Sequence, residues 1–304
     1  MAKIAIYTCI TGGYDTLRQP AAIWPEADYI CFVPEGIPAQ GGYDKTGGYD
    51  KTASPVMHGS SSVMPGSSSV MPGSSSVMPG SSSVMPGSTG PLGEGIPAQG
   101  GYDKTGGYDK TGGYDKTGGY DGVWRLRSFA CDAPGDVLQS RYPKINPHLV
   151  LPDYEYSLWM DGNTTVADAS LYDILKAKMD SGIVYSGLCH PLRDCIYDEA
   201  LRCLQTGRIS LPGYLKTVLR LKLNGFKTHQ GLTENNVIFR KHNCPEVVRM
   251  DELWWKLLLG GPLRDQLFFV YAMQKAGVKL DYLLPKEFCS RNHPAFGYYP
   301  HEKK

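Results

Sequence analysis

A block of tandem repeats in the middle of the chain limits what this sequence can fold into. The unit SSSVMPG occurs four times from residue 60 to 87, and GGYDKT occurs five times between residues 41 and 117. Residues 45–121 hold 18 of the 36 glycines and none of the cysteines or tryptophans. Such a segment cannot bury enough apolar surface to offset its chain entropy, so we expect it to be disordered.

The rest of the chain, residues 1–44 and 122–304, is predicted to form a single domain. Removing the 77 residues 45–121 from the 304 leaves 227 residues, and the two flanking segments then read as one continuous domain. We therefore interpret the repeats as an insertion within one surface loop. A multivalent or adhesive tract is the alternative interpretation, although glycine-serine repeats of this kind offer few anchoring side chains.

Charge and cysteine content exclude several classes of protein. The formal net charge is +1, which gives no indication of a nucleic-acid partner. The segment KIAIYTC at residue 3 has the pattern of a strand and not of a secretory signal, and no apolar run approaches the roughly 18 residues of a membrane span. The eight cysteines contain no CxxC pair, and CHPLRDC (189–195) does not have zinc-finger spacing. We expect a reducing, cytoplasmic location.

Short apolar runs alternate with amphipathic segments along the domain. The predicted strands are 3–9, 28–33, 156–160, 182–188, 235–241 and 278–284. The predicted helices are 168–180, 193–207, 213–225, 245–259 and 262–277. This alternation predicts an α/β fold with a mostly parallel sheet covered by helices on both faces.

The segment EYSLWMDGNTTV (155–166) contains the most informative strand end. A run of residues that looks buried on both faces stops abruptly at Asp161-Gly162-Asn163. Asp, Gly and Asn form tight turns, so a simple turn is one explanation. The other is a ligand site at the carboxyl end of a central strand, with carboxylate and carboxamide oxygens that suit Mg²⁺ or Mn²⁺.

Two further polar segments suit a phosphate-bearing ligand. In TCITGGYD (8–15), Gly12 and Gly13 let the backbone approach a ligand, and Tyr14 can stack on a base. In SRYPKINPH (140–148), Arg141 and Lys144 are three residues apart, so they share one face if this segment is helical, and two such cations suit a diphosphate. An ordinary turn and a solvated basic face are the alternatives.

The remaining polar segments lie in the second half of the chain. HPLRDCIYDEA (190–200) follows a predicted strand, and THQGLTENNVIFR (228–240) is dense in side chains that bond hydroxyl groups, which suits a sugar. Asp265 is well placed if its helix starts at the cleft, whereas a surface pair with Arg264 is the alternative. In RNHPAFGYYPH (291–301), His293 or His301 could fold back onto a metal.

The ordered motifs YTCITGGYD, SRYPKINPH, YSLWMDGN, HPLRDCIYDEA, GLTENNVIFR and RDQLFF resemble those of the TOD/MUCI glycosyltransferase-like domain family. The resemblance covers roughly residues 1–35 and 122–301 and omits the repeats. It implies a nucleotide-sugar-dependent fold of the GT-A type. It also implies that Asp161 matches the first position of a DxD metal motif, which closes here with Asn163.

These observations predict a glycosyltransferase that moves a sugar from a nucleotide diphosphate sugar to a hydroxyl of a glycan or glycoconjugate, with Mn²⁺ or Mg²⁺ as cofactor. An inverting enzyme would need a carboxylate base, for which Asp265 is the first choice and Glu234 the second. The candidate donor-binding residues are Thr8, Gly12, Gly13, Tyr14, Arg141, Lys144, His190, Arg193 and Asp194, and the candidate metal ligands are Asp161, Asn163 and His293.

Two alternative functions remain open. One is a metal-dependent hydrolase of a nucleotide sugar or other diphosphate, and another is a non-catalytic sugar-binding module or repeat-display scaffold. The basic, leucine-rich segment 211–227 also suggests peripheral contact with a membrane. For that segment, the commoner arrangement is leucines packed in the core with a solvated basic face.

Overall fold

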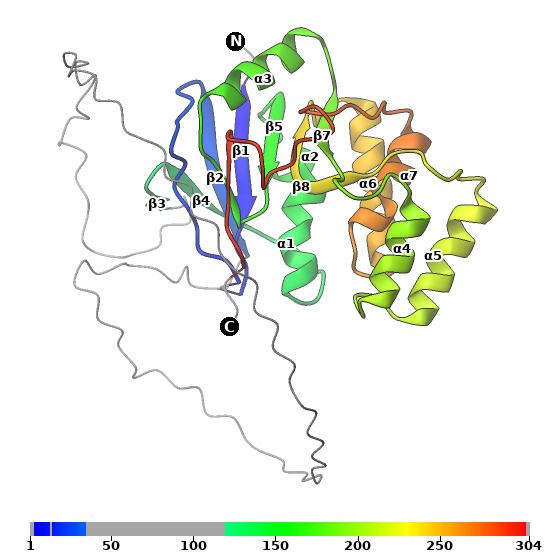
Figure 1. The fold of residues 1–304 in the computed structure, drawn as a ribbon. Coiled ribbons are helices and arrows are strands. Elements are labelled where there is room, and N and C mark those ends of the chain that lie inside the picture. Colours follow the sequence, from blue (N-terminus) through cyan, green and yellow to red (C-terminus); the bar gives the residue numbers. More distant parts are fainter. Residues whose placement is uncertain (1–2, 13, 35–118, 302–304) are drawn as a thin grey trace, which may run out of the picture. The chain divides into compact units, whose positions relative to one another are not determined.

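A computed structural model describes residues 3–12, 14–34 and 119–301 of the chain (Figure 1). Most of the repeat tract lies outside these residues, so its predicted disorder stays a prediction. At its carboxyl end, however, the predicted boundary at residue 121 is wrong. Tyr120–Asp121 form strand β3, which pairs with the next strand of the domain.

A seven-stranded sheet forms the centre of the described fold, in the order β3-β4-β2-β1-β5-β8-β7. β1, β2, β4 and β5 run parallel to one another, while β3 and β8 are antiparallel to their neighbours. The mostly parallel α/β sheet predicted from the sequence is therefore confirmed. The strands are Ile4–Cys9 (β1), Ala27–Pro34 (β2), Trp124–Phe129 (β4), Tyr156–Met160 (β5), Tyr185–Cys189 (β7) and Thr233–Arg240 (β8).

One predicted strand is wrong. Residues 278–284 form no strand, and a single isolated bridge links Tyr282 to Gly187 of β7. The segment runs beside β7 but contributes apolar side chains such as Leu283 and Leu284 to the core without a hydrogen-bond ladder. Leu283 and Leu284 are adjacent and both buried, which irregular backbone allows and an extended strand with one buried face does not.

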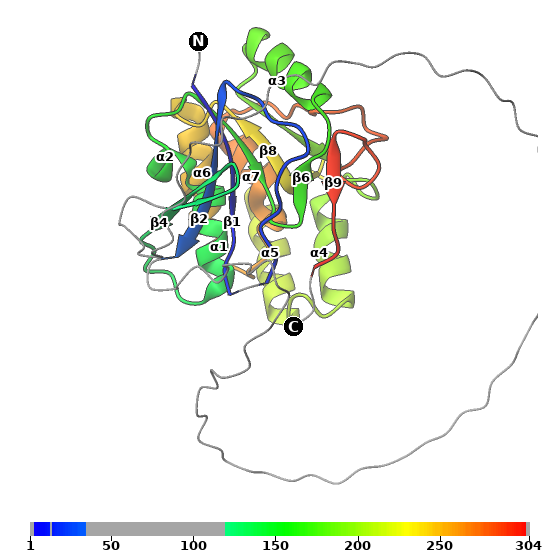
Figure 2. The ribbon, with the colours of Figure 1, turned by 90° about the vertical axis from the view of Figure 1, so that its left-hand side faces the viewer.

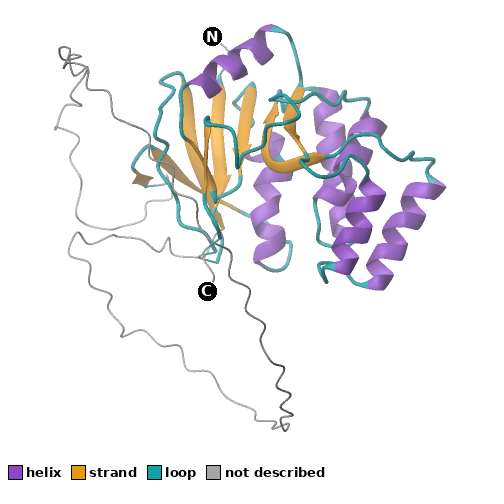
Figure 3. Ribbon diagram, in the orientation of Figure 1, coloured by secondary structure: helices purple, strands orange, loops and turns teal. Residues whose placement is uncertain are grey.

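Seven helices are present in the described residues (Figure 3). The five predicted helices are confirmed with small shifts at their ends, whereas the helix that carries Arg141 and Lys144 had been proposed only conditionally. The helices are Asp136–Ile145 (α1), Pro147–Val150 (α2), Ser170–Asp180 (α3), Ile196–Gln205 (α4), Leu211–Leu223 (α5), Pro245–Leu259 (α6) and Gln266–Ala276 (α7).

Side chains of the sheet alternate between two hydrophobic layers. On β1, Tyr7 joins the layer that contains buried residues of α1, α4, α5, α6 and α7, whereas Ile6 joins the layer that contains residues of α3. Helices therefore cover both faces of the sheet, as predicted. All five residues of β5 are buried, because this strand lies at the centre between the two layers.

A small second sheet joins the far end of the chain to the central strand. β6 (Thr164–Val166) follows directly after Asp161-Gly162-Asn163, and it pairs antiparallel with β9 (Phe296–Tyr298). Figure 2 shows these two strands side by side. The pairing brings residues 296–301 back to the carboxyl end of β5.

No helix of the described segments combines the length and the apolar composition that crossing a membrane requires. All eight cysteines are free thiols.

Candidate functional site

Polar segments from distant parts of the chain meet at one edge of the sheet. Parallel strands β1 and β5 both end there, and antiparallel β8 begins there, with Asp161 N donating to Asn236 O at 2.8 Å. Open α/β sheets bind ligands outside the carboxyl ends of their strands. Segments 8–15 and 161–163 therefore lie at the same edge as the start of β8.

Asp161 lies at the centre of this edge and is part of a defined hydrogen-bond network. Its Oδ1 accepts a hydrogen bond from Trp159 Nε1 at 2.7 Å and another from Lys144 Nζ at 3.1 Å. The Asp161 side chain is 35% exposed, whereas that of Lys144 is 6% exposed. The Oδ1 atom of Asp161 is thus held by two hydrogen bonds, while part of the side chain remains accessible to solvent.

Lys144 connects Asp161 to the start of α7. Its Nζ lies 2.8 Å from Asp265 Oδ2, and Arg141 Nε lies 3.7 Å from Asp265 Oδ1. Burial alone would raise the pKa of Asp265, but Lys144 and Arg141 outweigh it and hold that pKa well below its usual range. Four predicted site residues, Arg141, Lys144, Asp161 and Asp265, therefore form one charged cluster, which we call the Lys144 cluster.

The surroundings of Asp265 bear on the role we expected for it. It is buried beside two cations and does not form the exposed pair with Arg264 that was the alternative. A carboxylate whose pKa is held low is a weak proton acceptor. The geometry favours a role for Asp265 in positioning Lys144 over the role of a base.

A buried arginine supports Lys144 from behind. Arg240 Nη1 donates to Asp251 Oδ1 at 2.9 Å, and Nη2 donates to Tyr7 OH at 2.9 Å and also to the backbone oxygen of Lys144. Arg240 and Asp251 are fully buried. This set joins β1, the end of α1, β8 and α6, so the backbone that carries Lys144 is fixed by the core.

The metal ligands predicted at the Asp-Gly-Asn turn are only partly brought together. His301 Nε2 lies 3.4 Å from Asn163 Nδ2, and His301 Nδ1 lies 2.8 Å from Asp15 Oδ1. His293 lies elsewhere, with its ring centroid 5.1 Å from that of Phe288. Within the part of the chain that the structure describes, no contact links the His293 side chain to the turn, and His301 is the histidine that folds back onto it.

Glycines allow the two loops at this edge to approach each other. A Cβ added to Gly162 would lie 2.6 Å from Ile10 Cδ1, closer than real Cβ atoms approach, and 3.2 Å from Asp15 Oδ2, which is a tight contact. Gly12 has φ +57°, and an added Cβ would lie 2.7 Å from Asp136 Oδ2. The loop after β1 is thus pressed against the Asp-Gly-Asn turn.

The predicted donor-binding residues after β1 differ in their surroundings. Thr8 is buried, and its hydroxyl has no hydrogen-bond partner among the described residues. The Tyr14 side chain is exposed, and its ring centroid lies 4.8 Å from that of His301. Gly13 lies outside the described residues. The exposed ring of Tyr14 contacts His301, and its stacking on a base stays a prediction.

His190 and Arg193 are held by a buried carboxylate instead of joining the Lys144 cluster. Arg193 Nε donates to Glu199 Oε2 at 2.6 Å, and His190 Nε2 lies 3.8 Å from the same oxygen. Burial lowers the pKa of His190, and Arg193 lowers it further against the opposing effect of Glu199. Among the contacts of the described residues, none links this group to Asp161. The pairing points to a structural role for the two residues.

Asp194 belongs to a third group at the protein surface. Its Oδ1 lies 2.8 Å from His229 Nδ1. Cys195, Asp198 and the same histidine each offer a ligand atom within 4.8 Å of the others, the one such cluster of Cys, His or acidic residues in the described part of the chain. It is separate from the metal site predicted at Asp161.

Glu234 is bound on one side and free on the other. Its Oε1 pairs with Arg291 Nη1, while its buried Oε2 has no hydrogen-bond partner among the described residues. Arg291 in turn lies over the ring of Tyr298, 5.0 Å from the ring centroid. Arg291 and Asp15 were not predicted as site residues, because their roles depend on contacts between segments far apart in the chain. Trp159 was not predicted either, because its sequence pattern indicated only a buried strand residue.

Comparisons with known proteins leave the family of this chain open. No model of a protein family matches the chain, and no curated protein matches it. A solved structure, the apo form of mouse xyloside xylosyltransferase 1, is similar with a TM-score of 0.31 and 12% sequence identity. The match covers 52% of this chain and 62% of that chain, which is less than two thirds of its length. The α/β class rests on the strands and helices described above.

Proposed function

We propose that this chain is a glycosyltransferase of the GT-A type that transfers a sugar from a nucleotide diphosphate sugar to a hydroxyl acceptor. The observation that carries the proposal is the Lys144 cluster at the carboxyl end of β5. It combines two cations with the partly exposed carboxylate of Asp161. The exposed aromatic side chain of Tyr14 lies in the loop after β1. The resemblance to the TOD/MUCI glycosyltransferase-like family adds to this proposal.

The chemical task of the site is the departure of a diphosphate from an anomeric carbon. Negative charge grows on the leaving group, so cations placed beside it lower the barrier. Lys144 and Arg141 project from consecutive turns of α1 toward the same carboxylate, Asp265. Asp265 and the buried Arg240 fix Lys144, so its ammonium is preorganised and needs little rearrangement.

A divalent cation is the proposed cofactor, and the donor atoms at the turn fit a hard ion. The carboxylate of Asp161 and the carboxamide of Asn163 would hold Mn²⁺ or Mg²⁺, with Asp15 and His301 nearby in place of His293. Bound there, the ion would supply further positive charge for the diphosphate. Trp159 orients Asp161, and Lys144 limits how far its Oδ1 can turn.

Glu234 becomes the preferred base if the reaction inverts the anomeric carbon. It has one buried oxygen without a partner, whereas both oxygens of Asp265 face cations. A retaining reaction would not require this base. In the inverting case, Arg291 would hold the Glu234 carboxylate in place through their ion pair.

The test is a thermal-shift panel of nucleotide sugars, each with Mn²⁺ and with EDTA, followed by product analysis with glycan acceptors. A ligand at a hundred times its Kd stabilises the folded state by about 2.7 kcal/mol, which is readily detected. Transfer to an acceptor supports the proposal. Release of free sugar regardless of acceptor would identify a hydrolase, and binding without turnover would identify a sugar-binding module.

A further inference from the structure

Helix α5 presents a row of leucines to solvent. Leu211, Leu215, Leu219 and Leu223 are 55%, 55%, 58% and 77% exposed. They are spaced four residues apart along the helix, which lies beside α4 at the outer margin of the helical layer (Figure 1). The core contact of α5 is made instead by Thr217 and Leu221, which are buried.

The outward face of α5 combines these leucines with cations. Successive residues of a helix turn by about 100°, so the four leucines occupy an arc of roughly 120°. Lys222 falls within this arc and Lys216 at its edge, and both side chains are exposed. The helix also carries Arg220 and contains no acidic residue. The leucine row is therefore not the core-packed face that is the commoner arrangement for such a sequence.

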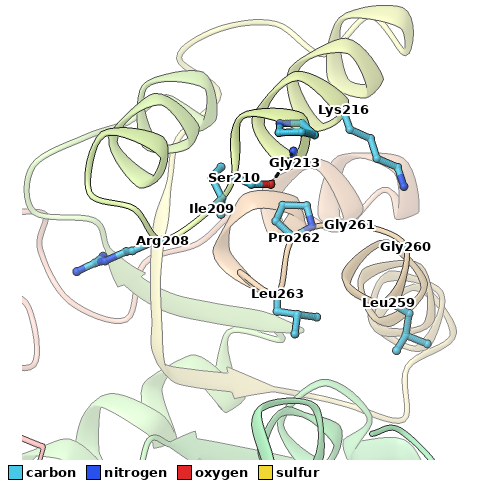
Figure 4. Close-up of a pocket in the computed structure, with 11 residues that line it drawn as sticks. Arg208, Ile209, Ser210, Gly213, Lys216, Leu259, Gly260, Gly261, Pro262 and Leu263 are labelled. Carbon is cyan, nitrogen blue, oxygen red and sulfur yellow. Dashed lines mark hydrogen bonds between the residues drawn. The ribbon is translucent and has the colours of Figure 1, made fainter. Parts of the chain in front are cut away.

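A hollow adjoins the first half of this face (Figure 4). It has a volume of about 540 Å³ and is bounded by the start of α5 and by the loop between α6 and α7. Lys216 and Arg208 contribute positive charge to its lining. Leu259 and Leu263, which also line it, are themselves 50% and 45% exposed. The apolar surface thus continues beyond α5 around a basic depression.

We propose that this face, made of α5 and the adjoining hollow, binds the surface of a bilayer that contains anionic phospholipids. The leucines would enter the boundary between headgroups and acyl chains, with α5 parallel to the membrane plane. The lipid phosphates would lie opposite the cations Lys216, Lys222 and Arg208. Their negative charge complements α5, which carries no carboxylate. Among the described residues, no segment covers the leucine row. This inference does not depend on the proposed transfer activity.

The test is co-sedimentation of the full chain with vesicles. Wild-type protein is expected to bind phosphatidylcholine vesicles that contain 30% phosphatidylglycerol, and not vesicles of phosphatidylcholine alone. Replacing Lys216 and Lys222 by glutamine is expected to weaken binding at low salt by at least tenfold, because each cation near an anionic surface contributes roughly fivefold. Raising the salt concentration is expected to weaken wild-type binding as well.

A matched pair of variants separates insertion from general charge effects. Leu219→Asp, at the centre of the row, is expected to reduce vesicle binding at least tenfold. Leu149→Asp is the control, because Leu149 is also 58% exposed but lies on α2. Melting curves of both variants establish that they are folded.

Three outcomes would overturn the proposal. The first is failure of the wild-type chain to bind anionic vesicles at low salt. The second is an equal effect of the two aspartate substitutions on vesicle binding. The third is a wild-type dimer that the Leu219→Asp substitution dissociates, while vesicles retain neither the wild type nor the variant. The last result would assign the face to contact between copies of this chain.

Discussion

Replacing Asp161 tests whether this residue serves a ligand or only a turn. Asp161→Asn keeps a side-chain oxygen that can accept the hydrogen bond from Trp159 Nε1, but it removes the negative charge. We expect the melting midpoint to stay close to that of the wild type. Transfer activity is expected to fall by about 10²- to 10³-fold, the usual effect of removing one electrostatic contact of a transition state.

Asp161→Ala adds a structural penalty whose size follows from the geometry. Trp159 is 3% exposed, so loss of the acceptor leaves a buried indole N–H without a partner. This costs about 1–3 kcal/mol. In a domain of this size, 1 kcal/mol shifts the midpoint by about 2–4 °C, so we expect a decrease of roughly 2–12 °C.

The assay is turnover per folded molecule, measured beside the melting midpoint for wild type, Asp161→Asn, Asp161→Ala and the exposed control Asp153→Asn. The control is expected to behave as wild type in both measurements. If Asp161→Asn transfers sugar at the wild-type rate, the ligand hypothesis fails and the Asp-Gly-Asn segment is a turn alone.

Three other perturbations address the cluster, the turn and the repeats. Asp265 has a lowered pKa, so its pairing with Lys144 stabilises the folded state above the unfolded pKa of about 3.9, and this stabilisation is lost as the pH falls. The difference in the free energy of unfolding between wild type and Asp265→Asn should therefore be larger at pH 7 than at pH 3. An equal difference at both pH values would contradict the ion pair. Gly162→Ala places a Cβ against Ile10 and should lower donor affinity, because the loop after β1 is displaced. A donor-induced thermal shift equal to that of the wild type would contradict this expectation. Deleting residues 45–118, which spares β3, should leave a cooperative melt with a similar midpoint, because loop length changes closure entropy only slowly; a chain that fails to fold would show that the tract supports the domain.

Much of the sheet could be predicted because its strands are short apolar runs bounded by polar residues. β1, β2 and β5 follow this pattern, and their parallel arrangement places their polar ends at one edge. The pattern fails for residues 278–284, which are apolar at the right positions but pair with β7 at one point only. Hydrophobic periodicity reports burial and not hydrogen bonding, so it cannot separate these cases.

The partners within the site were harder to predict because they depend on the pairing of distant segments. The choice between His293 and His301 is made by the register of β6 and β9, in which Thr164 pairs with Tyr298. Nothing in either short strand fixes that register from sequence alone. The orientation of α5 was hidden for a similar reason, since leucines occur on both its buried and its exposed sides.

The contacts of the buried Arg240 affect how the chain can fold while it is being synthesised. Its partner Tyr7 lies 233 residues earlier in the sequence, while Lys144 lies 96 residues earlier. A ribosome therefore delivers β1 and α1 long before the guanidinium that joins them. Contacts between such distant residues slow folding. During synthesis, the nascent chain exposes one side of β5 until β8 emerges, and this interval is when the chain would be most prone to aggregate or to engage a chaperone.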